Sequence, residues 1–572
     1  MITLGIHDGH TATACIVKDG KILSCVSEER LNRIKEWGGF PKSSIKECIK
    51  IARLQPEDID AVAVVGKIKP LKPENFSEPY PSRKLFSLGT KVMPKSFLRS
   101  SSWVSPAISI LEKNRGRREI SDNLKKLGIK EEPVYYEHHL IHAATAHLTC
   151  PSGTKENLIL TCDGSGDGLS ATVNVGKDLD IERLATVSNY NSLGEFYTRI
   201  TQYLGMKPLS HEYKVMGLAP YAKDIYGENT YNMVKDFFKV SDKNPLIFEN
   251  HSGFWKWGYI KNFQKIFLGH RFDNIAWAAQ KLIEEILVQW VKNAIRETDI
   301  HSVVLSGGVF MNVKANLKIL ELPEVERLFI LPSCGDESLA IGAALQRYAE
   351  LSGSPKIDPL GPLYFGSEFS NEQIDETINK KVNDKFKVER IDNIDEHVGE
   401  EVAKGKVVAR FSGRMEWGAR ALGNRSILAD GSNRDVVMKI NEAIKRRDFW
   451  MPFTPTILGE RADEYVINPK KIKAPYMIIA FETKDKAWED LIAALHPYDF
   501  TARPQILEKD WNPGYYRVLK TFESETGRGG LLNTSFNLHG DPIVCSPEDA
   551  TYTFEKSALD ALAIGNYFIS RV

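Results

Sequence analysis

The histidines of the run His138-His139-Leu140-Ile141-His142 have the type and spacing to bind a metal ion. His138 and His142 are four residues apart, so on a helix they share one face and can offer two neutral imidazoles to one divalent ion. Without partners, structural histidines would explain the run better. Asp163 and Asp336 supply partners, because each follows an apolar run where a buried strand gives way to a turn. We predict a metal site of His138, His142, Asp336 and Asp163.

Glycines near these aspartates predict a site at which the protein backbone contacts a nucleotide or a phosphate. Glycine lets the main chain reach a nucleotide or phosphate without an intervening side chain. A glycine pair at a strand end is also a common structural feature, so each motif alone is weak. The predicted phosphate or nucleotide contacts of this part of the chain are Gly164, Ser165, Gly166, Gly307, Gly308 and Asn312.

The first turn of the chain carries a candidate general base. His10 lies in the sequence Gly5-Ile-His7-Asp-Gly-His10-Thr11, and the ordinary pKa of histidine, near 6.5, suits a group that removes a proton at neutral pH. A turn histidine bonded to backbone is the structural alternative. We predict His10 as the base, with His7 as the competing assignment.

The last third of the chain contains a second polar set. Arginine binds phosphate through two parallel hydrogen bonds, and hydroxyl and amide side chains recognise ribose and base edges. A solvated helix face and a polar turn are the structural alternatives for the two clusters that contain Lys445 and Asn537. The predicted anion-binding residues are Arg420, Arg425, Lys445, Arg447, Ser535 and Asn537.

The elements that must hold these residues indicate an α/β protein of two domains. Residues 2 to 26 and 157 to 186 share one design of three strands joined by Asp/Gly turns, with the second pair of turns at 163–168 and 176–177. A long helix at 274–297 and a strand-helix-strand-helix run at 303–350 follow. Such a duplicated meander is typical of the actin, sugar-kinase and heat-shock-ATPase (ASKHA) fold. The Pro/Gly-rich stretch 353–362 then separates two predicted domains, at 1–355 and 363–572. The irregular segment 67–105 is either a surface insertion or a lid over an acceptor site.

Composition excludes several classes of protein. Lys+Arg and Asp+Glu both number 75, so no global field favours nucleic acid or a membrane. No apolar run approaches the roughly 18 residues that cross a bilayer, and the N-terminus lacks the features of a signal peptide, so we expect a cytoplasmic protein. The seven cysteines form no CxxC pair, which predicts reduced core residues.

Taken together, the motifs resemble those of the ATP-dependent O-carbamoyltransferases of the nodulation-factor and antibiotic-tailoring family. The resemblance extends over essentially the whole chain. Its motifs are His138-His-Leu-Ile-His142-Ala-Ala, Tyr213-Lys-Val-Met-Gly-Leu-Ala-Pro-Tyr221, Ser306-Gly-Gly-Val, Gly335-Asp336-Glu, Glu416-Trp-Gly-Ala-Arg420-Ala-Leu-Gly-Asn-Arg425, Thr501-Ala-Arg503-Pro-Gln505 and Asn533-Thr-Ser535-Phe-Asn537. One departure is Phe500, where members of the family commonly have glycine.

The resemblance implies an N-terminal domain like the tRNA threonylcarbamoyl-transferring enzymes and a YrdC-like C-terminal domain. Lys445-Arg-Arg447 and Ser535-Phe-Asn537 match the Lys-x-Arg and Ser-x-Asn patterns of YrdC-like proteins, and the resemblance adds Arg503 to the anion-binding set. It further implies that carbamoyl phosphate and ATP, with Mg²⁺, form carbamoyl-adenylate in the C-terminal domain. The N-terminal domain would then transfer the carbamoyl group to a hydroxyl of a small natural product such as an antibiotic.

Several questions stay open at this level. Two histidines with carboxylates suit iron(II), zinc or manganese, with iron(II) as the first candidate. The acceptor is not encoded in any readable pattern, and a homodimer is the candidate assembly. Alternative functions are a small-molecule kinase of the ASKHA class, a tRNA carbamoyl-type modification enzyme and a non-catalytic ATP-binding scaffold.

Overall fold

A computed structural model describes residues 1–572 apart from 68–105, 154, 257, 354–355 and 383–384. The predicted insertion or lid therefore lies, from residue 68 on, outside the described residues. The chain forms two compact units. The first unit comprises Met1–Lys21, Glu36–Lys42 and Gln55–Pro359, and the second comprises Ile22–Lys35, Ser43–Leu54 and Leu360–Val572. The two short N-terminal segments of the second unit are ones that the sequence analysis placed in the first domain.

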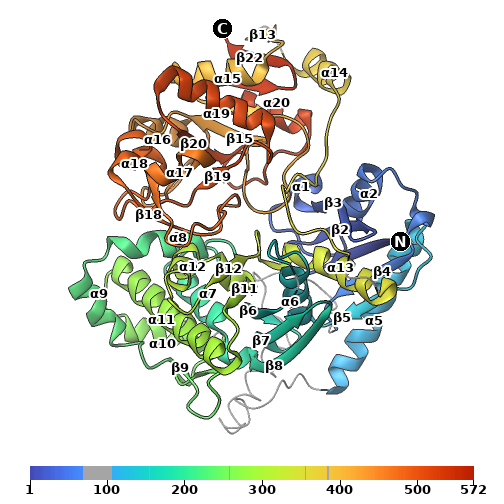
Figure 1. The fold of residues 1–572 in the computed structure, drawn as a ribbon, viewed down its shortest axis with the longest axis vertical. Helices are drawn as coiled ribbons and strands as arrows, with labels where there is room; N and C mark the ends of the chain where they lie inside the picture. Colours follow the sequence, from blue (N-terminus) through green and yellow to red (C-terminus); the bar gives the residue numbers. More distant parts are fainter. Residues whose placement is uncertain (68–105, 154, 257, 354–355, 383–384) are drawn as a thin grey trace. The chain divides into compact units, whose positions relative to one another are not determined.

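Two five-stranded sheets of the same topology lie in the N-terminal part of the chain (Figure 1). One has the order β3-β2-β1-β4-β5 and the other the order β12-β11-β6-β7-β8. In each, an antiparallel meander is extended by two parallel strands. The predicted duplication is therefore confirmed, and the fold class is α/β of the ASKHA type. The strands are β1 (Ile2–His7), β2 (Thr13–Lys18), β3 (Lys21–Ser27), β4 (Ala61–Val65), β5 (Val134–Tyr136), β6 (Asn157–Gly166), β7 (Leu169–Lys177), β8 (Asp180–Ser188), β11 (Ser302–Ser306) and β12 (Arg327–Ile330).

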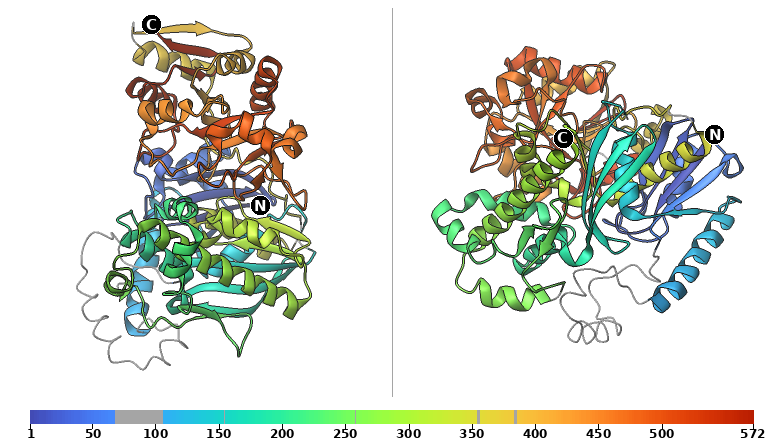
Figure 2. Two further views of the ribbon diagram at one scale, coloured as in Figure 1. Left: turned by 90° about the vertical axis from the view of Figure 1, so that its left-hand side faces the viewer. Right: turned by 60° about the horizontal axis from the view of Figure 1, so that its bottom comes forward.

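Small residues let two helices approach the sheets and each other. Helix α13 (Leu339–Ser352) packs on β1 and on α6 (His138–Leu148), and its yellow ribbon crosses the blue strands in Figure 2. A Cβ at Gly5 of β1 would lie 1.9 Å from the carbonyl oxygen of Ala340, and a Cβ at Gly342 would lie 2.0 Å from Thr145 Oγ1 on α6. These close contacts need glycine. The close packing brings α6, which carries the predicted ligands His138 and His142, next to α13, which follows the predicted ligand Asp336.

The turns of the second meander differ from the prediction. Strand β6 continues to Gly166 with a register shift after Cys162, and the turn is formed by Asp167 and Gly168. Both have positive φ, 49° and 89°, as the favoured two-residue hairpin turn requires. The following turn lies at Asp178, after Lys177 instead of at 176–177. The predicted turn of 163–166 is thus strand, and Asp163 lies on the central strand β6, in the irregular stretch between Cys162 and Gly166.

The remaining elements of the first unit surround these sheets. The long helix predicted at 274–297 is confirmed as α11 (Phe272–Thr298). The others are α5 (Pro106–Lys126), α7 (Leu193–Tyr203), α8 (Glu212–Leu218), α9 (Asp224–Tyr231), β9 (Phe238–Val240), β10 (Phe248–Asn250), α10 (Gly258–Ile266), α12 (Val313–Leu320) and the short turns η4 (Gly308–Met311) and η5 (Asp336–Ser338).

The second unit is built on an eight-stranded mixed sheet of order β13-β22-β21-β14-β15-β20-β16-β19. Two apolar clusters cover it, one around Ile427 and Leu562 and one around Leu428 and Leu531, because successive residues of a strand face opposite sides. Its strands are β13 (Phe386–Arg390), β14 (Val408–Phe411), β15 (Arg425–Ala429), β16 (Thr454–Leu458), β19 (Gln505–Leu507), β20 (Gly530–Ser535), β21 (Ala561–Ile564) and β22 (Tyr567–Arg571), and its helices include α1 (Glu29–Asn32), α14 (Asn371–Lys381), α15 (Ile394–Ala403), α19 (Pro513–Thr526) and α20 (Pro547–Lys556).

All seven cysteines are free and buried, as predicted. Among the described residues, no helix is long and apolar enough to cross a membrane.

Candidate functional site

The four predicted metal ligands converge in the first unit. His138 and His142 lie on the first turns of α6, Asp163 lies on β6 and Asp336 begins η5. Oδ2 of Asp163 is 3.1 Å from His138 Nε2 and 3.3 Å from His142 Nε2, and Oδ1 of Asp336 is 3.6 and 3.5 Å from the same nitrogens. One ligand atom from each of the four residues lies within 4.8 Å of the others. Such a set can enclose a single ion.

Charge and burial in this cluster fit a divalent cation. Burial lowers the pKa of His142, but Asp163 and Asp336 outweigh that effect and raise it to about 9. Burial also acts on Asp163, yet the two histidines hold the pKa of its carboxyl well below the ordinary value. Oδ1 of Asp336 is buried and makes no hydrogen bond within the described part of the chain. A carboxylate oxygen aimed at two imidazoles without a hydrogen bond of its own is what a metal ligand requires.

Neighbouring residues orient the ligands. Nδ1 of His142 lies 3.2 Å from Ser306 Oγ, at the end of β11, which fixes the ring so that Nε2 faces the carboxylates. The side chain of Glu137 caps α6 by accepting hydrogen bonds from the backbone of His139 and Leu140, each of 2.8 Å. The ligand pair therefore stands on a fixed helix start.

The turn after β1 brings both candidate base histidines to this cluster. His7 is only 5% exposed, and its Nε2 lies 3.0 Å from the carbonyl oxygen of His10 and 3.7 Å from Asp336 Oδ2. His10 is half-buried, and the neighbouring Thr11 donates from Oγ1 to Glu337 at 3.4 Å; burial raises the pKa of Glu337. His7 therefore has an ion-pair contact with a predicted metal ligand, and His10 is the more accessible of the two. Sequence reasoning gave Glu337 no role, although its place beside Asp336 was a signal.

The predicted glycine contacts have two kinds of surroundings. A Cβ at Gly166 would lie 2.1 Å from the ring of His138, and one at Gly308 would lie 2.8 Å from Asp163 Oδ1. Gly307 has φ of 101° and would place a Cβ 2.3 Å from the carbonyl oxygen of Cys162. These glycines therefore allow close packing against the predicted metal ligands and against β6. At Gly164 a Cβ would meet nothing within 4 Å, so only this glycine leaves open space for a ligand.

The two polar residues of the same predicted set also differ. Asn312 caps α12 by accepting from the backbone of Ala315 at 3.1 Å, and its amide is paired with Gln280 through contacts of 3.0 and 2.9 Å. These bonds give Asn312 a structural role. Ser165 is exposed next to Gly164 and is accessible to a ligand.

In the second unit, the predicted Lys445, Ser535 and Asn537 come together. Lys445 ends a short π-helical turn, η6 (Asn441–Lys445), and its Nζ donates to Asn537 Oδ1 at 2.7 Å and Ser535 Oγ at 3.1 Å. Lys445 is 3% exposed, and burial, with help from Arg447 and Lys35, holds its pKa well below the ordinary value. A buried cation surrounded by cations and neutral oxygens suits the binding of an anion.

Three guanidinium groups, those of Arg420, Arg447 and Arg503, adjoin this predicted anion site. Arg447 donates to Thr534 Oγ1 at 3.0 Å and stacks over the ring of Phe453 at 4.7 Å. Burial, followed by repulsion from Arg420 and Arg447, holds the pKa of Arg503 well below its ordinary value. No carboxylate pairs with Arg503 in the part of the chain that the structure describes. An anion would relieve this repulsion.

Arg425 has different surroundings from the other predicted arginines. Its side chain is fully buried and stacks over Phe411 at 3.7 Å. Nη1 donates to the carbonyl oxygens of Ser412 at 3.0 Å and Asn424 at 2.9 Å, and Nη2 reaches those of Ser367 and Gly413 at 3.3 Å. With both Nη groups bound to backbone carbonyls, Arg425 holds loops and is not placed to bind phosphate.

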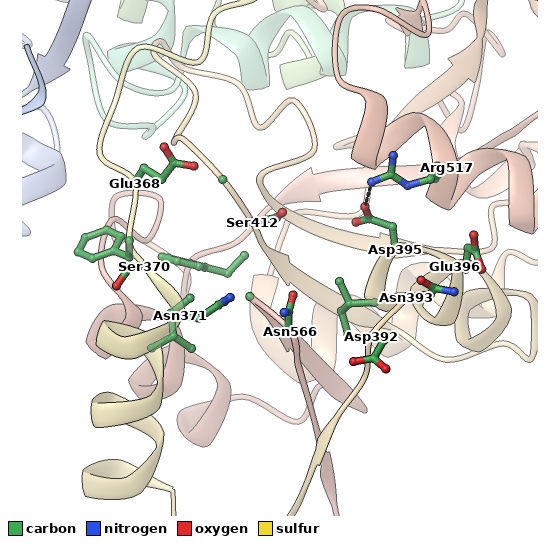
Figure 3. Close-up of a pocket in the computed structure, with 16 residues that line it drawn as sticks. Glu368, Ser370, Asn371, Asp392, Asn393, Asp395, Glu396, Ser412, Arg517 and Asn566 are labelled. Carbon is green, nitrogen blue, oxygen red and sulfur yellow. Dashed lines mark hydrogen bonds and ion pairs between the residues drawn. The ribbon is translucent and has the colours of Figure 1, made fainter.

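A separate cavity of about 580 Å³ in the second unit contains none of the predicted site residues. It lies at the starts of α14 and α15, and Figure 3 shows Asp395 paired with Arg517 there, at 2.8 Å. Its lining also includes the carboxylates of Glu368, Asp392 and Glu396. This negative charge repels phosphate, so we do not assign the cavity to a nucleotide.

Comparisons with known proteins cover both units. The family profile described as Carbamoyltransferase N-terminus matches residues 2–345, and that described as Carbamoyltransferase C-terminus matches residues 399–571. Uncharacterized protein MJ1051 of Methanocaldococcus jannaschii is 33% identical over 100% of this chain and 99% of its own. Nodulation protein NolNO of Sinorhizobium fredii is 32% identical over 99% of this chain and 79% of its own.

More distant matches cover parts of the chain. 3'-hydroxymethylcephem-O-carbamoyltransferase of Streptomyces clavuligerus is 27% identical over 52% of this chain and 54% of its own. Among solved structures, full-length HypF in a phosphate- and nucleotide-bound form is 13% identical, with a TM-score of 0.37, over 62% of this chain and 47% of its own. A likeness this low carries no argument.

Proposed function

Since the chain belongs to the carbamoyltransferase family, we propose that it is an ATP-dependent enzyme that moves a carbamoyl group from carbamoyl phosphate to a hydroxyl of a small molecule. The observation that carries the proposal is the presence of two polar centres of different chemistry in one chain. One is a cluster of two histidines and two aspartates, and the other is a set of buried cations. Two centres suit a reaction with two steps.

The proposed first step makes carbamoyl-adenylate at the cationic centre. Carbamoyl phosphate, ATP and one water give carbamoyl-adenylate, phosphate and pyrophosphate, and Mg²⁺ accompanies ATP. The amide nitrogen makes the carbamoyl carbonyl unreactive, so the adenylate supplies a good leaving group. Lys445, Arg447, Arg420 and Arg503 would bind the phosphate groups, and Ser535 and Asn537 would orient the nucleotide. The depressed pKa values of Lys445 and Arg503 support this, because burial and neighbouring cations act on both, and neither is paired with a carboxylate among the described residues.

The proposed second step transfers the carbamoyl group at the histidine-aspartate centre. The acceptor oxygen attacks the carbonyl carbon, the bond to AMP breaks, and His10 takes the acceptor's proton. His138, His142, Asp163 and Asp336 would hold a divalent metal, iron(II) first and zinc or manganese otherwise, which supplies Lewis-acid stabilisation of developing negative charge. The half-buried position of His10 in the turn beside Asp336 and Glu337 supports its role as the base.

The proposed acceptor is a hydroxylated natural product. One similar protein is named 3'-hydroxymethylcephem-O-carbamoyltransferase, a name that gives a small hydroxylated compound as its acceptor. The equal numbers of basic and acidic residues give no support to a nucleic acid as acceptor.

Pyrophosphate release tests the first step. Purified protein is incubated with ATP and Mg²⁺, with and without carbamoyl phosphate and without acceptor. Release that requires carbamoyl phosphate is expected. Transfer of the γ-phosphate of ATP to a hydroxylated acceptor would instead indicate a kinase, and ATP binding without pyrophosphate release would indicate a scaffold.

A His10→Ala variant tests the division of labour. Loss of a general base typically lowers the rate by roughly 10²- to 10⁴-fold. The variant is therefore expected to release pyrophosphate at the normal rate and to lose carbamoyl transfer by that factor. Loss of pyrophosphate release as well would contradict the separation of the two steps. A His7→Ala variant measured beside it distinguishes the two histidines.

A further inference from the structure

The turn between β1 and β2 holds His10 through its main chain. The imidazole of His10 is half-buried and makes no hydrogen bond among the described residues. Its carbonyl oxygen, in contrast, accepts two hydrogen bonds, from Nε2 of His7 at 3.0 Å and from Oγ1 of Thr11 at 2.6 Å. Thr11 has a left-handed backbone, φ 58°, which is unusual for a β-branched residue. The position of the His10 ring therefore depends on the contacts of its carbonyl group.

The ring of His7 packs against this turn. His7 ends β1 and is only 5% exposed. A Cβ at Gly9 would lie 2.8 Å from Cε1 and from Nε2 of His7, so glycine at this position leaves room for the ring. The carbonyl oxygen of Asp8 and the amide of Ala12 are bonded to the main chain of the segment 37–39, at 3.0 and 2.9 Å. The turn is thus fixed at both ends, and His7 fixes its middle.

The partner of Nε2 decides where a hydrogen of His7 lies. A carbonyl oxygen only accepts, so Nε2 of His7 carries a hydrogen and donates it to His10. This holds for the neutral and the charged ring alike. Nε2 therefore offers no lone pair to an acceptor hydroxyl, and the other ring nitrogen, Nδ1, is buried. His7 is for this reason not placed to act as the base.

The same ring lies beside a predicted metal ligand. Oδ1 of Asp336 is 3.6 Å from His138 Nε2 and 3.5 Å from His142 Nε2, and Oδ2 of Asp336 is 3.7 Å from His7 Nε2. His7 is not one of the four residues whose ligand atoms lie within 4.8 Å of one another. It therefore connects the predicted metal centre with the turn that carries His10, without being a ligand.

We propose that His7 is a positioning residue for carbamoyl transfer, which holds the turn in the conformation that presents His10 to the acceptor hydroxyl. A reacting group displaced by about 1 Å can lower a rate about 10²-fold, so the hydrogen bond from His7 to the turn has a large effect on transfer. This inference rests on the proposed function, because it concerns how the proposed base is held. Replacing His10 removes the base, whereas replacing His7 misplaces it.

The test compares His7→Gln with its matched control His7→Asn in the full-length protein. The amide nitrogen of glutamine takes the place of Nε2 and donates to the carbonyl oxygen of His10, whereas asparagine reaches only the place of Nδ1. With glycerol and a 3'-hydroxymethylcephem as probe acceptors, His7→Asn should lower the rate of transfer roughly 10- to 10²-fold and leave pyrophosphate release unchanged. His7→Gln should transfer at nearly the normal rate. Both variants should bind as much metal as wild type, because His7 supplies no ligand.

Hydrogen exchange gives a readout that needs no acceptor. Mass spectrometry of a peptide that contains residues 8–12 measures how often the turn opens. Losing one hydrogen bond of ordinary strength should raise the exchange rate about 5-fold in His7→Asn, and His7→Gln should exchange as wild type. Imidazole added to the assay should restore transfer to His10→Ala, which lacks the base, but not to His7→Asn, which retains it.

Equal exchange and equal transfer in His7→Gln and His7→Asn would overturn the inference. Rescue of His7→Asn by imidazole would show that His7 is the base, and loss of metal from His7→Gln would show that His7 is a ligand, so either result also contradicts a positioning role. Wild-type protein that carbamoylates neither probe would count against the proposed function alone. The exchange comparison would then decide whether His7 holds the turn.

Discussion

The most direct test of the metal centre is the replacement of a residue that is not a ligand. Gly166 ends β6, and a Cβ at this position would lie 2.1 Å from Cγ and 2.2 Å from Cδ2 of His138. Ordinary contact begins at 3.4 Å, so Gly166→Ala must displace the ring by about 1.3 Å. Metal-ligand distances tolerate only about 0.2 Å. The variant is therefore expected to lose His138 as a ligand.

The backbone does not complicate this experiment. Gly166 does not have a positive φ, so alanine is compatible with its conformation and the effect comes from the added methyl group alone. Loss of a supporting residue typically lowers metal affinity by about 10- to 100-fold, and loss of a ligand should exceed that range. Gly164→Ala is the matched control, because a Cβ there meets nothing within 4 Å.

Metal content is measured by mass spectrometry after equilibration with buffered iron(II), zinc or manganese, and folding is measured by thermal unfolding. We expect Gly166→Ala to behave as His138→Ala and Gly164→Ala to load metal as wild type, whatever its effect on turnover. Equal metal affinity of the two alanine variants, in folded protein, would refute both the steric argument and the placement of His138 in the centre.

Three further predictions concern the second unit. Burial and the nearby charges of Arg447 and Lys35 lower the pKa of Lys445, so at a pH between that lowered pKa and the ordinary value of about 10.4 Lys445 is neutral in the free protein. Binding of ATP in this pH range should protonate Lys445, with an uptake of as much as about one proton. The affinity for ATP should therefore fall as the pH rises through the range. Calorimetry in buffers of different ionisation enthalpy measures the uptake, which should be absent from Lys445→Met. Phe500 has φ of 57°, a strained backbone conformation for a residue other than glycine, and its ring stacks on Trp488 at a centroid distance of 5.1 Å. Phe500→Ala keeps the backbone strain and loses the ring contact. Phe500→Gly also loses the ring contact but relieves about 1 kcal/mol of backbone strain. Urea unfolding should show the glycine variant more stable than the alanine variant, and the reverse order would contradict this account. Arg425→Met removes the donors to four backbone carbonyls and should lower the free energy of unfolding by about 3 kcal/mol, a loss that a melting temperature within a degree of wild type would exclude.

Phe500 also shows how a departure from the family pattern acquires a physical meaning. The sequence shows only that phenylalanine replaces the glycine common in the family. The structure shows a left-handed conformation at this position, which glycine adopts without strain. The ring contact with Trp488 and the hydrogen bond from Thr483 Oγ1 to the carbonyl oxygen of Phe500, 2.7 Å, compensate for that strain.

The sequence by itself determined the features that depend on local pattern and residue chemistry. Alternating apolar runs and Asp-Gly turns predicted both meanders, because strand and turn propensities act over a few residues. The spacing of His138 and His142 predicted a ligand pair, because helical periodicity places them on one face. The motifs also indicated the carbamoyltransferase family, which the comparisons confirm.

Only the tertiary structure decided which distant residues become neighbours. Gly166 carries no visible sign that it lies against His138, and Arg425 looks like Arg420 until its donors are seen to be bound by carbonyls. Arg33 donates hydrogen bonds to the carbonyl oxygens of Pro542 and Ile543, and the second of these contacts joins residues 510 positions apart in the sequence. Such contacts depend on the order of strands and the closeness of packing, and no short stretch of sequence encodes either.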